Sequence, residues 1–421
     1  MKSDLFSLTK ISYVLIFGAS IGNLAAGLIE PTVAPYLEVL GSSSEVIGTI
    51  ISARWLMVAF FSLPLALFAS RFGLKRFLYF AAIFMMLGGY MILLGGKNGV
   101  YWFYLSIGIV SSIFNGPGVA ILSENKDSKR ITAFSLFFAN WLIPTAVGAL
   151  ISTFWFWKDD SYTPENLSSI FPLVTIFLVS GGLLFLLLLF VTNRHLSPRL
   201  SSENSSTDIY DARIPMIKQF QILFAPTIAL PLLLLIFAEF LSGAGAGSSL
   251  PYLIPYLKSL GATPSELSIL VVILNILMGF TTQLTPFLAK NFGDLRIIAI
   301  TTTLSVVCLL GIIFSDIMIL SAIFYILRGI LANMNSPISQ SRMLTYIDSR
   351  TRATGAATSS TIRWVGWVLF SPMSGSIIDD YGYNLAFLFT AILYMISLII
   401  FLSVVTRFTS LEEEEKECTS K

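Results

Sequence analysis

The stretch PTVAPYLEVLG at residues 31–41 returns later in the chain as PYLIPYLKSLG at residues 251–261. Six residues match at a constant offset of 220 positions: two prolines, a Tyr-Leu pair, a second leucine and the closing glycine. The same offset also pairs Phe60 with Phe280, Ala69 with Ala289, Phe72 with Phe292, Gly73 with Gly293, Arg76 with Arg296, Asn115 with Asn335 and Pro117 with Pro337. Matches that stay in register without a gap predict an internal duplication. We therefore expect two halves with the same fold.

The composition excludes a soluble protein. Of the 421 residues, 55% are hydrophobic and 12% are charged, whereas soluble domains are about 25% charged. Residues 171–191 and 385–405 carry no charge, and a helix of about 20 apolar residues spans the ~30 Å hydrocarbon core of a bilayer. The chain is therefore expected to lie in the lipid bilayer and to cross it many times. A net charge of +2 gives no reason to expect a nucleic-acid partner.

The apolar segments predict twelve membrane-spanning helices, so the expected fold is an all-α membrane protein. The predicted spans are residues 12–35, 46–69, 75–95, 100–122, 131–156, 170–192, 229–250, 266–289, 295–314, 317–341, 352–377 and 384–406.

A polar, Ser-rich segment at residues 193–218 separates the sixth span from the seventh and is typical of a flexible linker. It divides the chain into an N-terminal six-helix half at residues 1–192 and a C-terminal six-helix half at residues 219–408. The acidic tail at residues 409–421 is expected to be a solvated, disordered end.

Basic residues gather on one side of this predicted topology. With the amino terminus in the cytoplasm, the loop lysines and arginines fall on the cytoplasmic side except Lys97, Lys158 and Lys258. The positive-inside rule then predicts that both termini are cytoplasmic, in a multi-pass protein of the cell membrane. Six spans return the chain to its starting face, so the two halves run parallel. They should be related by a pseudo-twofold axis along the membrane normal, with a central cleft between them.

The loop after the second span has the sequence ALFASRFGLKR at residues 66–76, and its counterpart in the second half is AKNFGDLR at residues 289–296. With the polar linker and the two parallel halves, these loops resemble those of the major facilitator superfamily of secondary transporters, and the resemblance covers nearly the whole chain. It implies a cytoplasmic gating loop formed by Arg71, Gly73, Lys75, Arg76, Gly293 and Arg296. Ser70 replaces the aspartate that the family is thought to use as a latch, and Ala66 replaces a glycine.

Five charged residues lie inside the predicted spans and away from the span ends: Glu30, Arg54, Glu239, Arg328 and Arg363. A charge near the bilayer centre costs about 2.5–3.5 kcal/mol on insertion scales, so such residues usually have a use. The structural interpretation is ion pairing between helices or, for Glu30 and Arg54, snorkelling to the interface. In the functional interpretation Glu239 and Glu30 bind and release protons. The three arginines, which stay charged in proteins, then act as counterions or bind substrate.

Polar and aromatic residues in the spans provide a candidate substrate lining, composed of Asn23, Asn115, Asn140, Trp141, Asn335 and Trp364. The alternative for each is helix packing, since asparagine in a span often hydrogen-bonds a neighbouring helix. The duplicated Asn-x-Pro sequences at residues 115–117 and 335–337 suit a gate helix that bends, because proline removes a backbone donor. Glycines in SGAGAGSS at residues 242–249 predict a close contact between two helices.

These features predict a secondary transporter with small-molecule substrates, acting as a monomer and without a cofactor or metal. In the fifth span, NWLIPTAVGAL resembles the family's antiporter motif at Pro144 and Gly148, so the first hypothesis is proton-coupled efflux. The second is uptake or facilitated transport of an organic anion bound by Arg54, Arg328 and Arg363. The third is a membrane sensor or scaffold, which would be expected to carry a soluble appendage. The sequence lacks a nucleotide-binding loop and a metal-spaced His/Cys cluster, so no enzymatic activity is expected.

Overall fold

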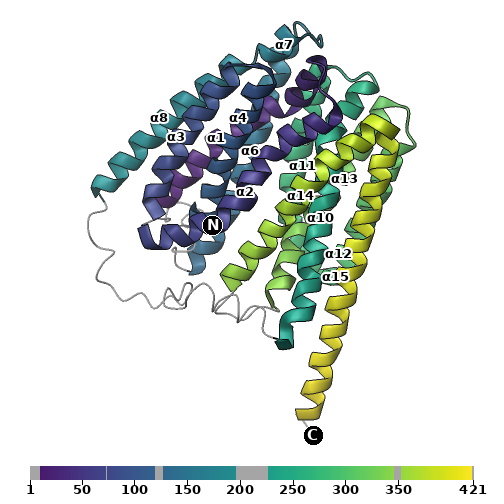
Figure 1. Cartoon of the computed structure of the whole chain (residues 1–421). Helices are drawn as coiled ribbons and strands as arrows, with labels where there is room; N and C mark the ends of the chain where they lie inside the picture. The colour runs from purple at the N-terminus through teal and green to yellow at the C-terminus, as the bar shows by residue number, and fades with distance from the viewer. Residues whose placement is uncertain (1–9, 73, 119–126, 196–225, 346–351, 420–421) are drawn as a thin grey trace.

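The computed structural model describes residues 10–72, 74–118, 127–195, 226–345 and 352–419 (Figure 1). These ranges contain helices and connecting loops without a β-strand, so the predicted all-α class is confirmed. Twelve of the described helices have at least 18 residues, in agreement with the twelve predicted spans.

The first half contains α1 (Lys10–Val39), α2 (Ser44–Phe72), α3 (Leu74–Leu93), α4 (Gly96–Ile113), α6 (Asp127–Phe156) and α8 (Phe171–His195). The second half contains α10 (Pro226–Ser259), α11 (Pro264–Phe292), α12 (Asp294–Ile313), α13 (Met318–Thr345), α14 (Arg352–Tyr381) and α15 (Tyr383–Thr419). A π-helical turn, η1 (Phe114–Gly118), continues α4, and the short α7 (Pro164–Ser168) precedes α8.

Nine of the described helices are long and apolar enough to cross a membrane by length and composition. Of the other three long helices, α4 has the polar residues Lys97 and Asn98 in its first turn, and α14 contains a Thr- and Ser-rich stretch before Arg363. In α6 the apolar segment among the described residues is Asn140–Phe156.

The duplication is visible in the helix boundaries. Helix α2 covers residues 44–72 and α11 covers residues 264–292, a shift of 220 positions at both ends. Helices α3 and α12 show the same shift at both ends. The predicted internal repeat is therefore a repeat of structure.

The two halves pack as a pseudo-twofold pair (Figure 1). Within the first half α1 packs on α6 and α3 packs on α8, and within the second half α10 packs on α14 and α12 packs on α15. Between the halves the main contacts are α2 with α14 and α6 with α11. A rotation that exchanges α2 with α11 and α6 with α14 converts one of these contacts into the other. The predicted pseudo-symmetry is confirmed.

The repeated sequence forms the carboxyl ends of α1 and α10. In the first copy the N–H of Ser42 donates to the carbonyl of Leu37, and the N–H of Gly41 donates to that of Glu38. This is a Schellman motif, in which the final glycine takes a positive φ that other residues rarely adopt. Gly41 has φ +70° and Gly261 has φ +97°. The second copy forms both hydrogen bonds 220 positions later.

The tyrosine of the repeated sequence anchors the same loop in each half. The Tyr36 hydroxyl accepts a hydrogen bond at 2.9 Å from the N–H of Gly96, the first residue of α4 after the turn from α3. The Tyr256 hydroxyl donates to the carbonyl of Ile312, at the end of α12, at 3.0 Å. Both rings are buried, so each copy ties the end of its first helix to the turn after its third.

The chain segments that leave and enter the two halves lie at one end of the bundle. Helix α8 ends there and α10 begins there, and we call it the linker end (Figure 1). The opposite end carries α7 and the turns after α1 and α10, and we call it the distal end. Apart from residues 193–195, which belong to α8, the predicted linker lies outside the described residues.

Helix α15 continues through the acidic segment to Thr419 and projects beyond the bundle (Figure 1). The expectation of a disordered tail is therefore wrong up to that residue. Glutamate and lysine are good helix formers, so the run EEEEKE extends a helix that the membrane span has already nucleated.

Candidate functional site

A buried ion pair joins α10 to α14 inside the second half. Glu239 on α10 is 6% exposed. Arg363 on α14 reaches its Oε2 with Nε at 2.7 Å and with Nη2 at 2.5 Å. The arginine side chain keeps 25% of its surface exposed, so one member of the pair is sealed and the other is accessible. The structure thus brings two of the five charged candidates into direct contact.

Glycines allow this contact. A Cβ on Gly243 would lie 1.9 Å from the carbonyl oxygen of Arg363, and a Cβ on Gly247 would lie 2.4 Å from that of Trp367. The prediction that glycines of this stretch permit a close helix contact is confirmed. Glu239 lies one helical turn before Gly243, so the close approach of α14 to α10 brings Arg363 within contact distance of the Glu239 carboxylate.

Arg328 is separate from this pair. It lies on α13, is 2% exposed, and its Nη2 donates to the hydroxyls of Ser249 and Tyr394 at 3.0 Å each. Its Nε is buried without a hydrogen-bond partner, and among the described residues no carboxylate lies within ion-pair distance of it. Neutral groups alone hold this positive charge.

Glu30 faces the space between the halves. Its side chain is exposed within a run of buried residues near the distal end of α1. The carboxylate interacts electrostatically with Arg54 on α2, with Tyr104 on α4 and with Tyr325 on α13. Tyr325 on α13 belongs to the second half, so these interactions include residues of both halves. These four residues form the part of the candidate site that both halves share.

An aromatic stack joins the halves beside Arg54. Trp55 on α2 stacks on Trp364 on α14, with ring centroids 3.9 Å apart and planes 4° from parallel. Trp367 lies 5.5 Å from Trp55 in a tilted arrangement. The Arg54 guanidinium lies 4.9 Å from the centroid of the Trp55 ring, and its Nε donates to the Ser111 hydroxyl at 3.3 Å. The predicted lining residue Trp364 is therefore at the interface between the halves.

Two predicted lining asparagines hold α1 against α6. Asn23 donates to the carbonyl of Asn140 at 3.1 Å. Asn140 is buried and donates to the carbonyl of Ile16 at 2.9 Å, while its own side-chain carbonyl accepts a hydrogen bond from Ser20. Their observed contacts are those of helix packing.

The other predicted lining residues are distributed over three helical segments. Asn115 is exposed in η1 and donates to the carbonyl of Ser111. Asn335 on α13 donates to Thr302 on α12, and its buried carbonyl oxygen has no hydrogen-bond partner. Trp141 on α6 is 47% exposed. The π-helical turn at Phe114–Gly118 includes the first Asn-x-Pro sequence, where we expected a helix that bends.

The gating loop is described only in part. Gly293 has φ +87° between α11 and α12, as a tight turn requires. Arg76 and Arg296 are exposed at the starts of α3 and α12. Gly73 and the side chains of Arg71 and Lys75 lie outside the described residues.

The comparisons with known proteins agree with this architecture. The profile of the Major Facilitator Superfamily matches residues 15–239 and again residues 235–418. The chain belongs to this superfamily. It is a membrane transporter for small molecules rather than an enzyme. A search of curated proteins found no match.

Solved structures of superfamily transporters share the fold. A bacterial homolog of the human lysosomal transporter Spinster, in an inward-facing and unoccupied conformation, has 13% identity and a TM-score of 0.75, covering 96% of this chain and 98% of its own. The D-xylose-proton symporter has 13% identity and a TM-score of 0.70, with coverage of 93% and 96%. A point mutant of the nucleoside transporter NupG has 14% identity and a TM-score of 0.65, with coverage of 95% and 99%. At these identities the likeness concerns the fold.

Sequence reasoning missed the aromatic members of the site, namely Trp55, Tyr104, Tyr325 and Tyr394. The chain has 15 tyrosines and 7 tryptophans, and no spacing distinguishes these four from the rest. For Trp55 one signal was present, its position next to Arg54 within a span. Among the described residues no group of three metal-binding side chains is close enough to hold an ion.

Proposed function

We propose that the protein is a proton-coupled exporter of a small organic solute that works by alternating access. The observation that supports this best is the ion pair between Glu239 and Arg363. A buried pair is weak evidence for stability, because desolvation of both charges offsets their attraction. Because stability alone does not account for such a pair, we favour a functional use. In this use, protonation of Glu239 removes the negative charge that pairs with Arg363.

Protonation at this pair can act on the contact between the halves. Arg363 and Trp364 are neighbours on α14, and Trp364 stacks on Trp55 of the other half. When Glu239 is neutral, Arg363 loses its ion pair and is free to turn toward its exposed side. A movement of α14 at this point changes the stack, which is the type of coupling that alternating access requires.

The solute site in this proposal is the space shared by Glu30, Arg54, Tyr104 and Tyr325. It offers both signs of charge together with aromatic rings. Such a lining suits a small amphipathic molecule with a polar head and an apolar body. Glu30 is the second candidate proton carrier, because its carboxylate is exposed to this space.

The orientation of the chain in the membrane supports the proposed direction of transport. The positive-inside pattern favours a cytoplasmic linker end, with both termini in the cytoplasm of a cell-membrane protein. Contacts between the halves at the distal end then leave the site open toward the cytoplasm, where an exporter collects its solute. The partial antiporter motif around Pro144 and Gly148 favours the same direction. We expect the monomer to be the functional unit.

Transport by purified protein tests this proposal. A thermal-shift screen first identifies a compound that raises the apparent stability of the folded protein. In proteoliposomes an imposed proton gradient should then drive uphill movement of this compound. Glu239→Gln should abolish the gradient-driven movement and spare exchange, whereas Glu165→Gln, on the short α7, should change neither. Gradient-driven transport that survives Glu239→Gln contradicts the proton role.

A second candidate function is transport of an organic anion. It is favoured by Arg328, whose buried charge has no carboxylate partner among the described residues. Under this alternative Arg328→Gln abolishes the binding of anionic compounds in the thermal-shift screen and leaves neutral compounds unaffected. An unchanged set of ligands contradicts it.

A further inference from the structure

Polar contacts between the halves gather at the distal end. Several hydrogen bonds and an ion pair join described residues of the two halves, and they involve the distal part of a helix or an adjoining loop. Alternating access requires this end to open once in every cycle. The contacts that hold it shut must therefore be specific enough to close it and weak enough to break.

The first of these contacts lies at the start of α2. Asp379, near the end of α14, accepts hydrogen bonds from the backbone N–H of Ser44 at 2.9 Å and from that of Glu45 at 3.2 Å. The first N–H groups of a helix have no partner within the helix and carry partial positive charge. A carboxylate from the second half thus caps a helix of the first half. Gly375 permits the approach, since a Cβ there would lie 2.5 Å from the backbone of Glu45.

The second contact is the counterpart of the first. Asp160, in the loop after α6, accepts hydrogen bonds from the N–H of Ser265 at 2.8 Å and from its hydroxyl at 2.5 Å. Ser265 is in the first turn of α11 and lies 220 positions after Glu45. Here a carboxylate from the first half contacts the start of a helix in the second half. The chain has an Asp-Asp pair at residues 159–160 and another at residues 379–380, again 220 positions apart. Opposite members of the two pairs make the contacts.

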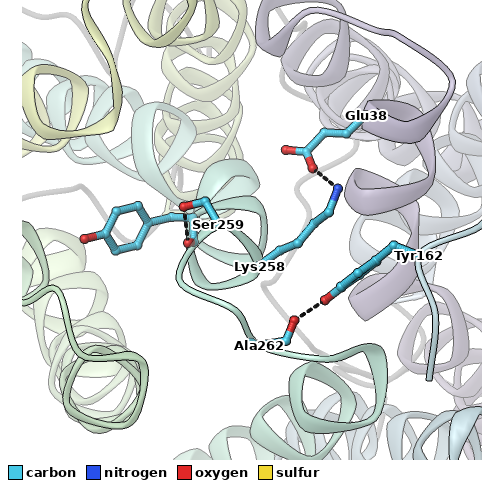
Figure 2. A network of polar contacts seen from close by, with 6 residues as sticks. Glu38, Tyr162, Lys258, Ser259 and Ala262 are labelled. Atoms are coloured by element: carbon cyan, nitrogen blue, oxygen red, sulfur yellow. Dashed lines mark hydrogen bonds and ion pairs between the residues drawn. The ribbon is translucent and has the colours of Figure 1, made fainter.

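A third group of contacts also joins the two halves at the distal end (Figure 2). Lys258 forms an ion pair with Glu38 at 2.5 Å and lies 5.0 Å from the centroid of the Tyr162 ring. The Tyr162 hydroxyl donates to the carbonyl of Ala262. Burial, assisted by the negative charge of Asp160, raises the pKa of this hydroxyl, so it keeps its proton and remains a donor at neutral pH. Residues of both halves meet here in one continuous polar patch.

We propose that Asp160 and Asp379 are a pair of latches, related by the pseudo-twofold axis, that close the distal entrance of the transport path. Each latch joins a carboxylate of one half to the start of a helix in the other, through two backbone N–H groups at Asp379 and through the N–H and hydroxyl of Ser265 at Asp160. When the halves separate, water replaces the carboxylate at these N–H groups and hydrates the aspartate, so the net gain from closure is modest. A gate made of two such contacts can close the path and still open in each cycle. This inference rests on the fold and on no assumption about proton coupling or substrate.

Distance measurements between the halves test the latches. Spin labels at Asn98→Cys and Asp316→Cys, both exposed at the distal end of opposite halves, report the separation of the halves in full-length protein in lipid nanodiscs. The background carries Cys308→Ser and Cys418→Ser. Asp379→Ala and Asp160→Ala should each raise the ratio of distal-open to distal-closed molecules by about two- to thirtyfold, the range found when a helix cap is replaced by alanine. Asp379→Asn and Asp160→Asn keep one acceptor oxygen each and should therefore shift the ratio less than the alanine variants, because asparagine also caps helices through its side-chain oxygen.

The neighbouring aspartates provide matched controls. Asp159→Ala and Asp380→Ala remove the same charge one position away, where neither side chain makes a described contact, and should leave the distance distribution unchanged. Alanine variants that keep the original distribution overturn the proposal, as do controls that shift it equally.

Hydrogen–deuterium exchange provides a second measurement on unlabelled protein and separates a latch from a loss of stability. Either alanine variant should speed exchange in the first turns of both α2 and α11, because both latches are broken whenever the halves separate, and should leave helices packed within one half, such as α3 and α8, unchanged. Equal acceleration in α3 and α8 would mean general destabilisation and would overturn the proposal.

Discussion

Glu38 and Lys258 occupy the same position of the two copies, 220 residues apart, and they form an ion pair with each other at 2.5 Å. Under a twofold rotation each position maps onto the other, so two equivalent residues can touch only close to the axis. The pair thus marks where the pseudo-twofold axis leaves the distal end (Figure 2). Identical charges there would repel, and the two copies carry opposite charges.

Exchange of these two charges tests the axial pair. Glu38→Lys alone places two lysines together and should lower stability by about 1 kcal/mol, since partly exposed pairs contribute roughly 0.2–1 kcal/mol and like charges reverse the sign. Glu38→Lys combined with Lys258→Glu should recover most of the loss. Thermal unfolding in detergent measures both effects. If the double variant is no more stable than Glu38→Lys alone, opposite charge is not what stabilises this pair.

A pair of glycine substitutions tests the contact between α10 and α14. Gly243→Ala places a Cβ 1.9 Å from the carbonyl oxygen of Arg363, so the two helices must separate and the Glu239 contact should be lost. We expect a loss of about 1–3 kcal/mol, as for overpacking in a tight core. Gly22→Ala is the matched control, because a Cβ there meets nothing within 4 Å. It should be neutral or stabilise α1 by up to ~1 kcal/mol. Equal melting temperatures for the two variants would show that the close approach is not tight.

The repeat could be predicted from the sequence because its matching residues have specific structural roles. Gly41 and Gly261 adopt positive φ, and Tyr36 and Tyr256 each fasten a particular loop. Few other residues can fill such roles, so the same residues occur at the same spacing in both copies. The twelve spans could also be predicted, because a helix that crosses the bilayer needs a long apolar segment.

The interaction partners of the buried charged residues could not be predicted from the sequence. Three arginines could have paired with Glu239 or clustered around one anion, and sequence gives only their depth in each span. The contact with Arg363 depends on which face of α14 meets α10, and the glycine at position 243 decides this through close packing. Arg328 lies on another helix among neutral hydroxyls. Two helices must be placed relative to each other before either outcome can be predicted.

The stacked tryptophans should couple the halves energetically. Trp55→Ala and Trp364→Ala each remove one ring of the inter-half stack, and aromatic pairs contribute about 0.5–1.5 kcal/mol beyond their buried area. A double-mutant cycle on thermal unfolding should give a coupling energy in that range. The pair Phe237 and Phe240, which lies within one helix, provides a control for general loss of aromatic surface. A coupling energy near zero for the tryptophans would show that the rings are adjacent without interacting.

The Glu239–Arg363 pair predicts an ordered series of stabilities. Arg363→Met leaves a carboxylate that is 6% exposed without its partner, and breaking a buried pair costs about 3–5 kcal/mol. Glu239→Gln should cost less, because the unpaired Arg363 side chain is 25% exposed and can be solvated. The double variant should be more stable than Arg363→Met alone, since no buried charge remains. Thermal unfolding of the three variants at neutral pH measures the order.

Acidification separates this explanation from simple loss of packing. In Arg363→Met the unpaired carboxylate can take up a proton, so lowering the pH should recover stability in this variant. In the double variant no carboxylate remains at this position, and the same change of pH should bring no comparable recovery. If Arg363→Met and the double variant respond equally to acid, the cost of Arg363→Met comes from lost side-chain contacts and not from an unpaired carboxylate.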